Sequence, residues 1–312
     1  MPIKNNSLTI VSRKSRLALT QAEIVQKKLQ TLHPDLNIEI IGISTRGDEI
    51  LDQSLNKIGG KGLFVKELEN CLLNGEADIA VHSMKDVPAE LPQGLDLGAI
   101  LMRADPRDVL LHLQHLSLAQ LPQGAVVGTS SLRRQAQILA IRQDLKIAEL
   151  RGNVETRVKK LIDGDYTAIV LAAAGLERLA LNQWLSQPLA ITSMLPAVGQ
   201  GVLGIEYRVD DLRIKQLIAP LNHQLSASCL QAERAMNETL NGGCQAPVAG
   251  LALIENNVLT LRGLVGSPDG QIIYRAQHAG DPVDAKVIGV QVGAELIAQG
   301  ADKIIRELTL KY

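Results

Sequence analysis

Aromatic residues are scarce in this sequence of 312 residues. They make up 2% of the chain, with one Phe and one Trp, which leaves few rings on which nucleic-acid bases could stack. The formal net charge is -1, so the chain has no general electrostatic attraction for a polyanion. We therefore expect no nucleic-acid partner.

Cysteines and long apolar runs are also few. The three cysteines, Cys71, Cys229 and Cys244, are an odd number without a Cys-x-x-Cys pair, and the N-terminus has no basic stretch followed by an apolar run and a cleavage site. These features favour free thiols in a reducing, cytoplasmic setting. No stretch approaches the roughly 18 consecutive apolar residues of a membrane span, so none is expected.

Motifs for common ligands are missing as well. The chain has no Gly-x-x-x-x-Gly-Lys-Ser/Thr phosphate loop, and we expect no dinucleotide-binding unit, in which a glycine motif joins a strand to a helix. Its six histidines are scattered, without His-x-x-x-His spacing, so no metal site is expected.

The elements that the sequence does predict are two α/β regions followed by a small α+β region. Strand, helix and strand at 8–11, 17–32 and 37–44 predict a right-handed unit of a parallel sheet, and a second such block begins near Leu101. A Pro/Gly-rich hinge candidate at 196–201 precedes a strand at 202–208, helices at 212–221 and 227–240, and strands at 248–254, 258–267 and 271–279. A final helix is expected at 284–308, with an interruption near Gly300 as the alternative to a continuous helix. The short turns between the last three strands predict antiparallel pairing.

One long segment has no convincing period. Residues 45–62 are rich in glycine and charge and precede an expected helix at 63–73. Loops of this length in compact domains often cover a site, so this loop is a candidate lid.

Arginines follow the expected strand ends. Arg133 and Arg134 open a helix, where cations oppose the helix dipole unless an anion is bound there. Guanidinium groups pair bidentately with carboxylates and phosphates, and polycarboxylates fit better here because nucleotide motifs are missing. The alternative is that these residues are solvated surface charges. The arginines in question are Arg13, Arg133, Arg134, Arg151, Arg157 and Arg178.

Two further residues are candidates for chemistry. Asp86 follows a short apolar strand, and the Val87-Pro88 pair after it favours an extended turn that presents the carboxylate; a plain ion pair with Lys85 is the alternative. Cys244 follows two glycines and precedes Pro247, which predicts an exposed loop. The alternative is a half-buried thiol at a helix end.

Six motifs, taken in chain order, resemble the porphobilinogen deaminase family over the whole chain. They are Ser12-Arg13-x-Ser15-x-Leu17-Ala18-Leu19, Gly59-Gly60-Lys61-Gly62-Leu63-Phe64, Val81-His82-Ser83-Met84-Lys85-Asp86-Val87-Pro88, Gly128-Thr129-Ser130-Ser131-Leu132-Arg133-Arg134, Leu150-Arg151-Gly152-Asn153-x-x-Thr156-Arg157 and Gly242-Gly243-Cys244-x-x-Pro247. One departure is Arg16, where many relatives have proline.

The resemblance implies a fold and a reaction. The fold would be α/β, with two α/β domains of the periplasmic-binding-protein type flanking a cleft, plus a small C-terminal α+β domain. The domains would span 1–101 with 200–218, 102–199, and 219–312. The enzyme would be a monomeric transferase of haem biosynthesis. It would condense four porphobilinogen units head to tail on a covalent dipyrromethane cofactor, with loss of ammonia, and then release hydroxymethylbilane.

The resemblance also implies residue roles. Asp86 would be catalytic, Cys244 would hold the cofactor through a thioether, and Phe64 would belong to the lid. The other expected cofactor-binding residues are Asp86, Lys85, Ser131, Arg133, Arg134, Arg151 and Gly152. The expected substrate-binding residues are Arg13, Ser15, Arg151, Arg157 and Arg178.

Two alternatives come from other classes. A non-enzymatic polycarboxylate-binding protein of the periplasmic-binding-protein type would explain the arginines alone. A cysteine hydrolase or acyltransferase would need a base near Cys244, and no nearby pattern supplies one.

Overall fold

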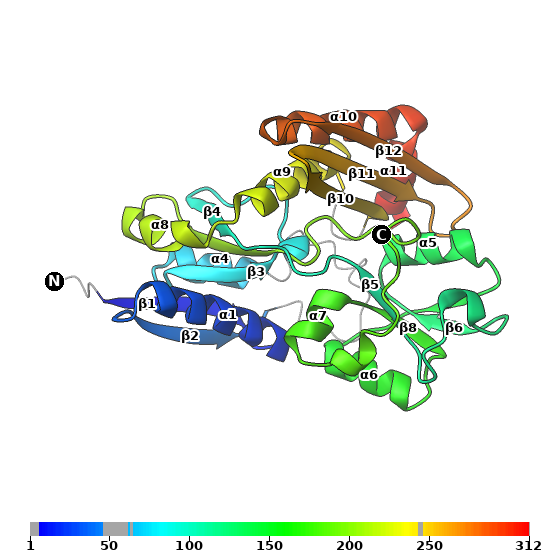
Figure 1. Ribbon diagram of the computed structural model, residues 1–312, viewed down its shortest axis with the longest axis horizontal. Coiled ribbons are helices and arrows are strands. Elements are labelled where there is room, and N and C mark those ends of the chain that lie inside the picture. The colour runs from blue at the N-terminus through cyan, green and yellow to red at the C-terminus, as the bar shows by residue number, and fades with distance from the viewer. Residues whose placement is uncertain (1–5, 46–61, 63–64, 243–245, 312) are drawn as a thin grey trace. The chain divides into compact units, whose positions relative to one another are not determined.

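The computed structural model describes residues 6–45, 62, 65–242 and 246–311. The chain forms two compact units, each built from two separate stretches (Figure 1). Unit 1 comprises Met1–Arg103 and Val202–Ala227, and unit 2 comprises Ala104–Gly201 and Ser228–Tyr312. Residues 46–61 of the expected lid loop, Phe64 and Cys244 lie outside the described residues.

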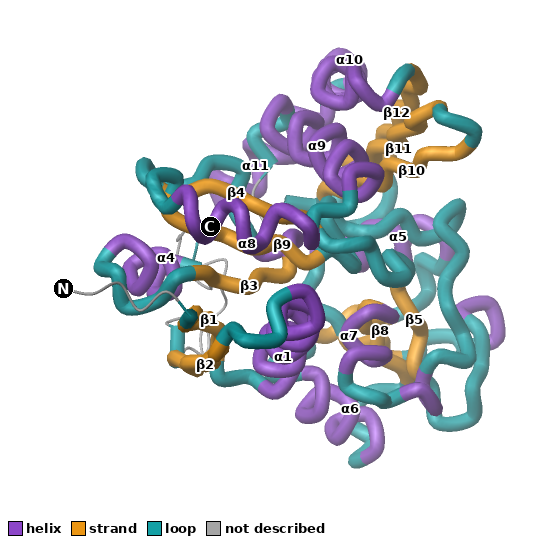
Figure 2. The backbone as a smooth tube through the Cα atoms, turned by 60° about the vertical axis from the view of Figure 1, so that its left-hand side comes forward, coloured by secondary structure: helices purple, strands orange, loops and turns teal. Residues whose placement is uncertain are grey.

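Unit 1 contains a five-stranded sheet of order β2-β1-β3-β9-β4. β1 is parallel to β2 and β3, whereas β9 is antiparallel to both β3 and β4, between which it lies (Figure 2). The strands are β1 (Ser7–Arg13), β2 (Asn37–Ile43), β3 (Ile79–Ser83), β4 (Leu95–Ile100) and β9 (Leu203–Arg208). The strand that follows residue 201 therefore completes the sheet begun by the first hundred residues.

Helices cover both faces of this sheet. The helices are α1 (Arg16–Leu32), α4 (Lys66–Leu73) and α8 (Leu212–Ile218). Ser15 caps α1, and its buried residues Ala18, Ala22, Val25 and Leu29 repeat at helical spacing. Residues of α1 and α8 share one apolar cluster with the sheet, and α4 shares another, so α4 lies on the opposite face.

Unit 2 contains a four-stranded sheet of order β5-β8-β6-β7. Its strands are β5 (Asp108–Leu111), β6 (Val126–Gly128), β7 (Lys146–Ala148) and β8 (Ala168–Ala172), with helices α5 (Leu132–Ile141), α6 (Val154–Ile162) and α7 (Ala173–Arg178). Ile138 of α5 packs in one cluster, whereas Val158 of α6 and Leu176 of α7 pack in another. The sheet thus has a helix on one face and two on the other.

The remainder of unit 2 is an antiparallel sheet of order β10-β11-β12 with helices packed on one face. The strands are β10 (Val248–Glu255), β11 (Val258–Gly266) and β12 (Ile273–Gly280). The helices are α9 (Gln224–Thr239), which belongs to unit 2 from Ser228 onward, α10 (Ala285–Gln299) and α11 (Ala301–Lys311). The predicted fold class, α/β followed by a small α+β region, is confirmed. The predicted three-domain boundaries stay a prediction.

Most element predictions agree with the structure to within a few residues, and the differences are local. The segment expected as a helix at 284–308 is interrupted at Gly300, the position that the sequence indicated; Gly300 has a φ of 108° and ends α10. β4 and β5 were not predicted, because Gly98 interrupts β4 and β5 begins with an aspartate. None of the described helices is long and apolar enough to cross a membrane.

Candidate functional site

In unit 1, Asp86 follows the carboxyl end of β3. It lies in a 3-10 turn, Met84–Asp86, that the strand enters directly. Asp86 and Arg13 line the same small cavity, of about 30 Å³, together with Ser83, Gln21 and His82. Two of the predicted residues are therefore brought together at one sheet edge, where ligands of open α/β sheets bind. Lys85 is half-buried beside Asp86, and Ser15 caps the helix that follows Arg13.

Neighbouring polar side chains support this edge of unit 1. Gln21 Nε2 donates to Ser83 Oγ at 2.9 Å, which ties α1 to the end of β3. His82 Nε2 lies 2.8 Å from Glu206 Oε2, and both residues are buried. Within the part of the chain that the structure describes, Glu206 Oε1 has no hydrogen-bond partner. Burial and the nearby charge of Glu206 raise the pKa of Glu69, so acidic groups gather behind the turn that carries Asp86.

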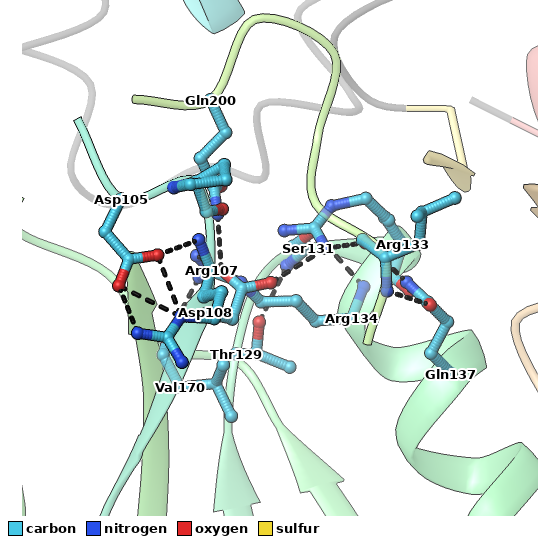
Figure 3. A network of polar contacts seen from close by, with 12 residues as sticks. Asp105, Arg107, Asp108, Thr129, Ser131, Arg133, Arg134, Gln137, Val170 and Gln200 are labelled. Atoms are coloured by element: carbon cyan, nitrogen blue, oxygen red, sulfur yellow. Dashed lines mark hydrogen bonds and ion pairs between the residues drawn. The ribbon is translucent and has the colours of Figure 1, made fainter. Parts of the chain in front are cut away.

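In unit 2, Arg133 and Arg134 converge on Asp108 (Figure 3). Arg133 Nη1 donates to Asp108 Oδ2 at 2.8 Å, and Arg134 Nη2 and Nε donate to Oδ1 at 2.7 and 3.1 Å. Asp108 is fully buried, and the two arginines are 4% and 7% exposed. These arginines are therefore not solvated surface charges.

The charges of this triad do not balance. Burial raises the pKa of Asp108, but the two guanidinium groups outweigh it and hold that pKa well below its usual range. One carboxylate then faces two cations, which leaves an excess positive charge in a nearly dry place. Buried charge of this kind is costly unless it is paired, so the site favours an anionic ligand.

Local structure explains how these side chains reach one another. Ser131 caps α5, and Ser131 N donates to Thr129 Oγ1, which fixes the turn after β6 and the first turn of the helix. Asp108 pairs with Ala172 at the carboxyl end of β8. The triad therefore lies at the carboxyl edge of the parallel strands of unit 2.

Gln200 is a further member of this network that the sequence did not predict. Its Nε2 donates to Asp108 Oδ1 at 3.0 Å and to Pro106 O at 2.6 Å. Its buried Oε1 has no hydrogen-bond partner among the described residues. Gly199 and Gly201, with φ of 71° and 85°, flank it in tight turns. With Gly204 they match Gly-x-Gly-x-x-Gly, but this motif leads into β9 and opens no helix, so it is no dinucleotide site.

Of the other predicted cations of unit 2, Arg151 lies in the loop before α6, Arg157 lies within α6, and Arg178 ends α7. Arg151 pairs with exposed Glu149, and Arg157 Nε donates to Gly152 O at 2.7 Å. Gly152 has a φ of 107°, and an added Cβ would press on Thr156. Arg178 Nη2 donates to Gly201 O at 2.8 Å, and burial lowers the pKa of Arg178.

A dipyrromethane, whose rings each carry an acetate and a propionate, fits these residues. Arg133 uses only Nη1, which also donates to Leu195 O. Its Nε and Nη2 make no hydrogen bond within the described residues. Unused donors on a buried guanidinium and an excess positive charge are what a carboxylate requires.

Comparison with known proteins agrees with this chemistry. The family model described as "Porphobilinogen deaminase, dipyromethane cofactor binding domain" matches residues 8–216, and "Porphobilinogen deaminase, C-terminal domain" matches residues 227–298. The chain is thus a transferase of tetrapyrrole biosynthesis with a dipyrromethane cofactor. It belongs to the porphobilinogen deaminase family, which condenses porphobilinogen head to tail on that cofactor with loss of ammonia. The match favours this enzyme over the non-enzymatic binding protein.

Solved structures give weaker likenesses. A putative methionine-binding lipoprotein from Bacillus subtilis shares 12% identity, covering 70% of this chain and 91% of its own, with a TM-score of 0.44. The periplasmic aliphatic sulphonate binding protein from Escherichia coli shares 13% identity, covering 76% and 71%, with a TM-score of 0.41. Likenesses this low carry no conclusion about function.

Proposed function

We propose that the enzyme is a hydroxymethylbilane synthase in which Asp86 is the catalytic carboxylate and Cys244 is the attachment point of the cofactor. The observation that carries the proposal is the buried triad of Asp108, Arg133 and Arg134. Its excess positive charge suits the acetate and propionate groups that accumulate as the chain of pyrroles grows. Arg13 beside Asp86, and Arg151, Arg157 and Arg178 in unit 2, supply further cations.

The proposed role of Asp86 follows from the reaction. Loss of ammonia from porphobilinogen leaves a cationic methylene-pyrrole, which a fixed carboxylate near the ring nitrogen stabilises. Such a preorganised charge is worth about 3–4 kcal/mol of barrier in a site that excludes water. Gln21 and Ser83 hold the strand end from which Asp86 projects, so the carboxylate needs little rearrangement.

The roles of the other residues follow from their donors. Arg133 offers Nε and Nη2 to a cofactor carboxylate while Asp108 and Leu195 O fix its Nη1. Ser131 and Lys85 would add hydrogen bonds, and Gly152 leaves room for a carboxylate near Arg151. When bound, the dipyrromethane supplies the nucleophilic pyrrole to which each substrate unit is added. A thiol such as Cys244 captures the same electrophile once, as a stable thioether.

Mass spectrometry of the intact protein tests the attachment. The active enzyme should be heavier than its polypeptide by one dipyrromethane, and Cys244→Ala should lack this mass. A matched control is Cys71→Ala, which should keep it, because Cys71 is half-buried and packs against an apolar cluster of unit 1. An active wild-type enzyme with the bare polypeptide mass would contradict the assignment.

Turnover measurements test the proposed catalytic role of Asp86. With porphobilinogen, the wild-type protein should release ammonia and a linear tetrapyrrole, and Asp86→Asn should do so about 10²–10³-fold more slowly. Asp96→Asn is a suitable control, because Asp96 is an exposed residue of β4. Near-normal turnover by Asp86→Asn would remove this residue from the catalytic role.

A further inference from the structure

A second cavity, of about 370 Å³, lies within unit 2 and shares no lining residue with the triad. One wall comes from Gln137 of α5 and from the segment that holds Ile191 and Leu195. The facing wall comes from β11 and β12, including Arg262 and Arg275. A cavity of this volume is within the range of small-molecule sites.

The facing wall is the side of the antiparallel sheet away from its helices. Arg262 pairs with Gln277 across the two strands, and Leu264 pairs with Arg275, so these four residues share one face. The other face, with Leu261 and Val265, packs on the helices. The second face is therefore left to the cavity and to a small apolar cluster that includes Leu195 and Leu264.

The polar lining carries unused donors. Arg262 Nε donates to Gln277 Oε1 at 2.9 Å, but within the described residues its Nη atoms, and the whole guanidinium of Arg275, make no hydrogen bond or ion pair. The lining carboxylate, Glu295, is engaged at 2.8 Å by His278. Two guanidinium forks, one half-buried (Arg262) and one exposed to solvent (Arg275), thus line one cavity without an acceptor among the described residues. Such forks match carboxylate, sulfonate and phosphate groups.

The rest of the lining is apolar. Ile191, Leu195 and Leu264 supply hydrocarbon surface on both walls. We propose that this cavity is a binding site for a small organic anion, a molecule that places an acidic group on the arginines and an apolar body against these side chains. The site is separate from the one proposed for the dipyrromethane.

The inner wall connects this cavity with the triad. Leu195 N donates to Gln137 Oε1 at 2.7 Å, and Leu195 O accepts from Gln137 Nε2 and from Arg133 Nη1 at 3.0 and 2.7 Å. A ligand that displaces Leu195 would therefore change the hydrogen bonding of Arg133. This second effect rests on the proposed function, whereas binding does not, and binding is measured without porphobilinogen.

Fluorescence titration of the full-length holoenzyme tests the binding site. The probes are 1-anilinonaphthalene-8-sulfonate and its uncharged counterpart N-phenyl-1-naphthylamine. We expect one saturable site for the sulfonate and at least tenfold weaker binding of the uncharged probe, because a charge-assisted hydrogen bond contributes this much or more. Equal affinity for the two probes would overturn the anion specificity.

Variants locate the probe. Arg275→Glu should weaken sulfonate binding at least tenfold, and Thr192→Trp, a change at an exposed lining residue, should block the cavity. Lys286→Glu makes the same change of charge on an exposed residue of α10 outside the lining, and should leave the affinity unchanged. If Arg275→Glu does not fold, Thr192→Trp still shows whether the probe binds in this cavity. Absence of saturable binding, or wild-type affinity in a folded lining variant, would overturn the proposal.

Discussion

Asp108 is fully buried, yet it stays ionised because Arg133, Arg134 and Gln200 all donate to its carboxylate. Removing one partner of a buried ion pair leaves charge without compensation, which costs about 3–5 kcal/mol. The same carboxylate holds the two arginines that we assign to the cofactor. Stability and ligand binding in unit 2 therefore depend on one side chain.

Asp108→Asn should lower the free energy of unfolding of unit 2 by about 3–5 kcal/mol at neutral pH, measured by urea denaturation. Asp163→Asn, which removes an exposed i,i+4 pair with Lys159, should change it little, because surface pairs contribute at most about 1 kcal/mol. Equal effects of the two substitutions would contradict the buried role.

The pH dependence of the wild-type protein has a defined sign. The pKa of Asp108 is lowered in the folded protein, so its stabilisation is complete above the unfolded aspartate pKa of about 3.9 and is lost as the pH falls below it. The Asp108→Asn variant should lack the part of the acid-induced loss of stability that comes from protonation of this carboxylate. If the free energy of unfolding of this variant falls at low pH as much as that of the wild type, another group controls the acid sensitivity.

The candidate site residues that the structure brings together in unit 2 lie in local motifs. Arg133 and Arg134 follow a strand end and a capping serine, and the helix-dipole argument identified them as candidates for an anion. Asp108 and Gln200 were missed, because each contacts a partner 25 to 92 residues away in the chain. The sequence signal that could have identified Asp108 is its position directly before the apolar run Val109–Leu111, because a carboxylate buried with that run needs a cationic partner.

At the scale of elements, the turn between β11 and β12 packs closely against helix α5. Gly270 joins β11 to β12 and has a φ of 72°. An added Cβ would meet the backbone of α5, including Leu139 C at 2.7 Å. Gln135 Nε2 of the same helix donates to Pro268 O at 3.0 Å. The turn therefore needs a residue without a side chain.

Gly270→Ala should destabilise unit 2 by about 2–5 kcal/mol, the sum of a left-handed backbone conformation and overpacking. Gly164→Ala is the matched control: Gly164 has a φ of 87° but no atom within 4 Å of an added Cβ. Gly164→Ala should lower the free energy of unfolding by only about 1–2 kcal/mol. Thermal unfolding measures both, and equal losses would mean that the contact with α5 contributes nothing.

The sequence predicted most elements because apolar spacing and capping are local. Ser15, His33-Pro34 and Gly300 give the ends of helices directly. β4 was missed because Gly98 interrupts an irregular pairing with β9. A side chain added at Gly98 would meet Tyr207 and Ile218. The position of β4 in the sheet therefore depends on residues more than a hundred positions away in the chain.

At the scale of the molecule, each described hydrophobic cluster lies wholly within one unit. Chains with separate cores often depart from two-state unfolding. The division into units follows from long-range strand pairing, which a sequence pattern does not show. The predicted return of the chain near residue 202 came from the family resemblance.

Leu29→Ala, in the core of unit 1, should cost about 2–5 kcal/mol. Hydrogen exchange should then rise in the strands and helices of unit 1, including Leu203–Arg208, while Val109–Leu111 and Val248–Glu255 of unit 2 keep their protection. Ile138→Val provides the reciprocal change in unit 2. A uniform rise across the chain would show a single cooperative structure.

The position of β9 between β3 and β4 has a consequence for synthesis on the ribosome. Both neighbours pair with a strand that is translated about a hundred residues after β4. At roughly 5–20 residues per second, the open edges of β3 and β4 wait about 5–20 s for their partner. The strands β5 to β8 need no later segment and can pair during that interval. A chaperone that binds unpaired strand edges would therefore act on the first hundred residues of the nascent chain.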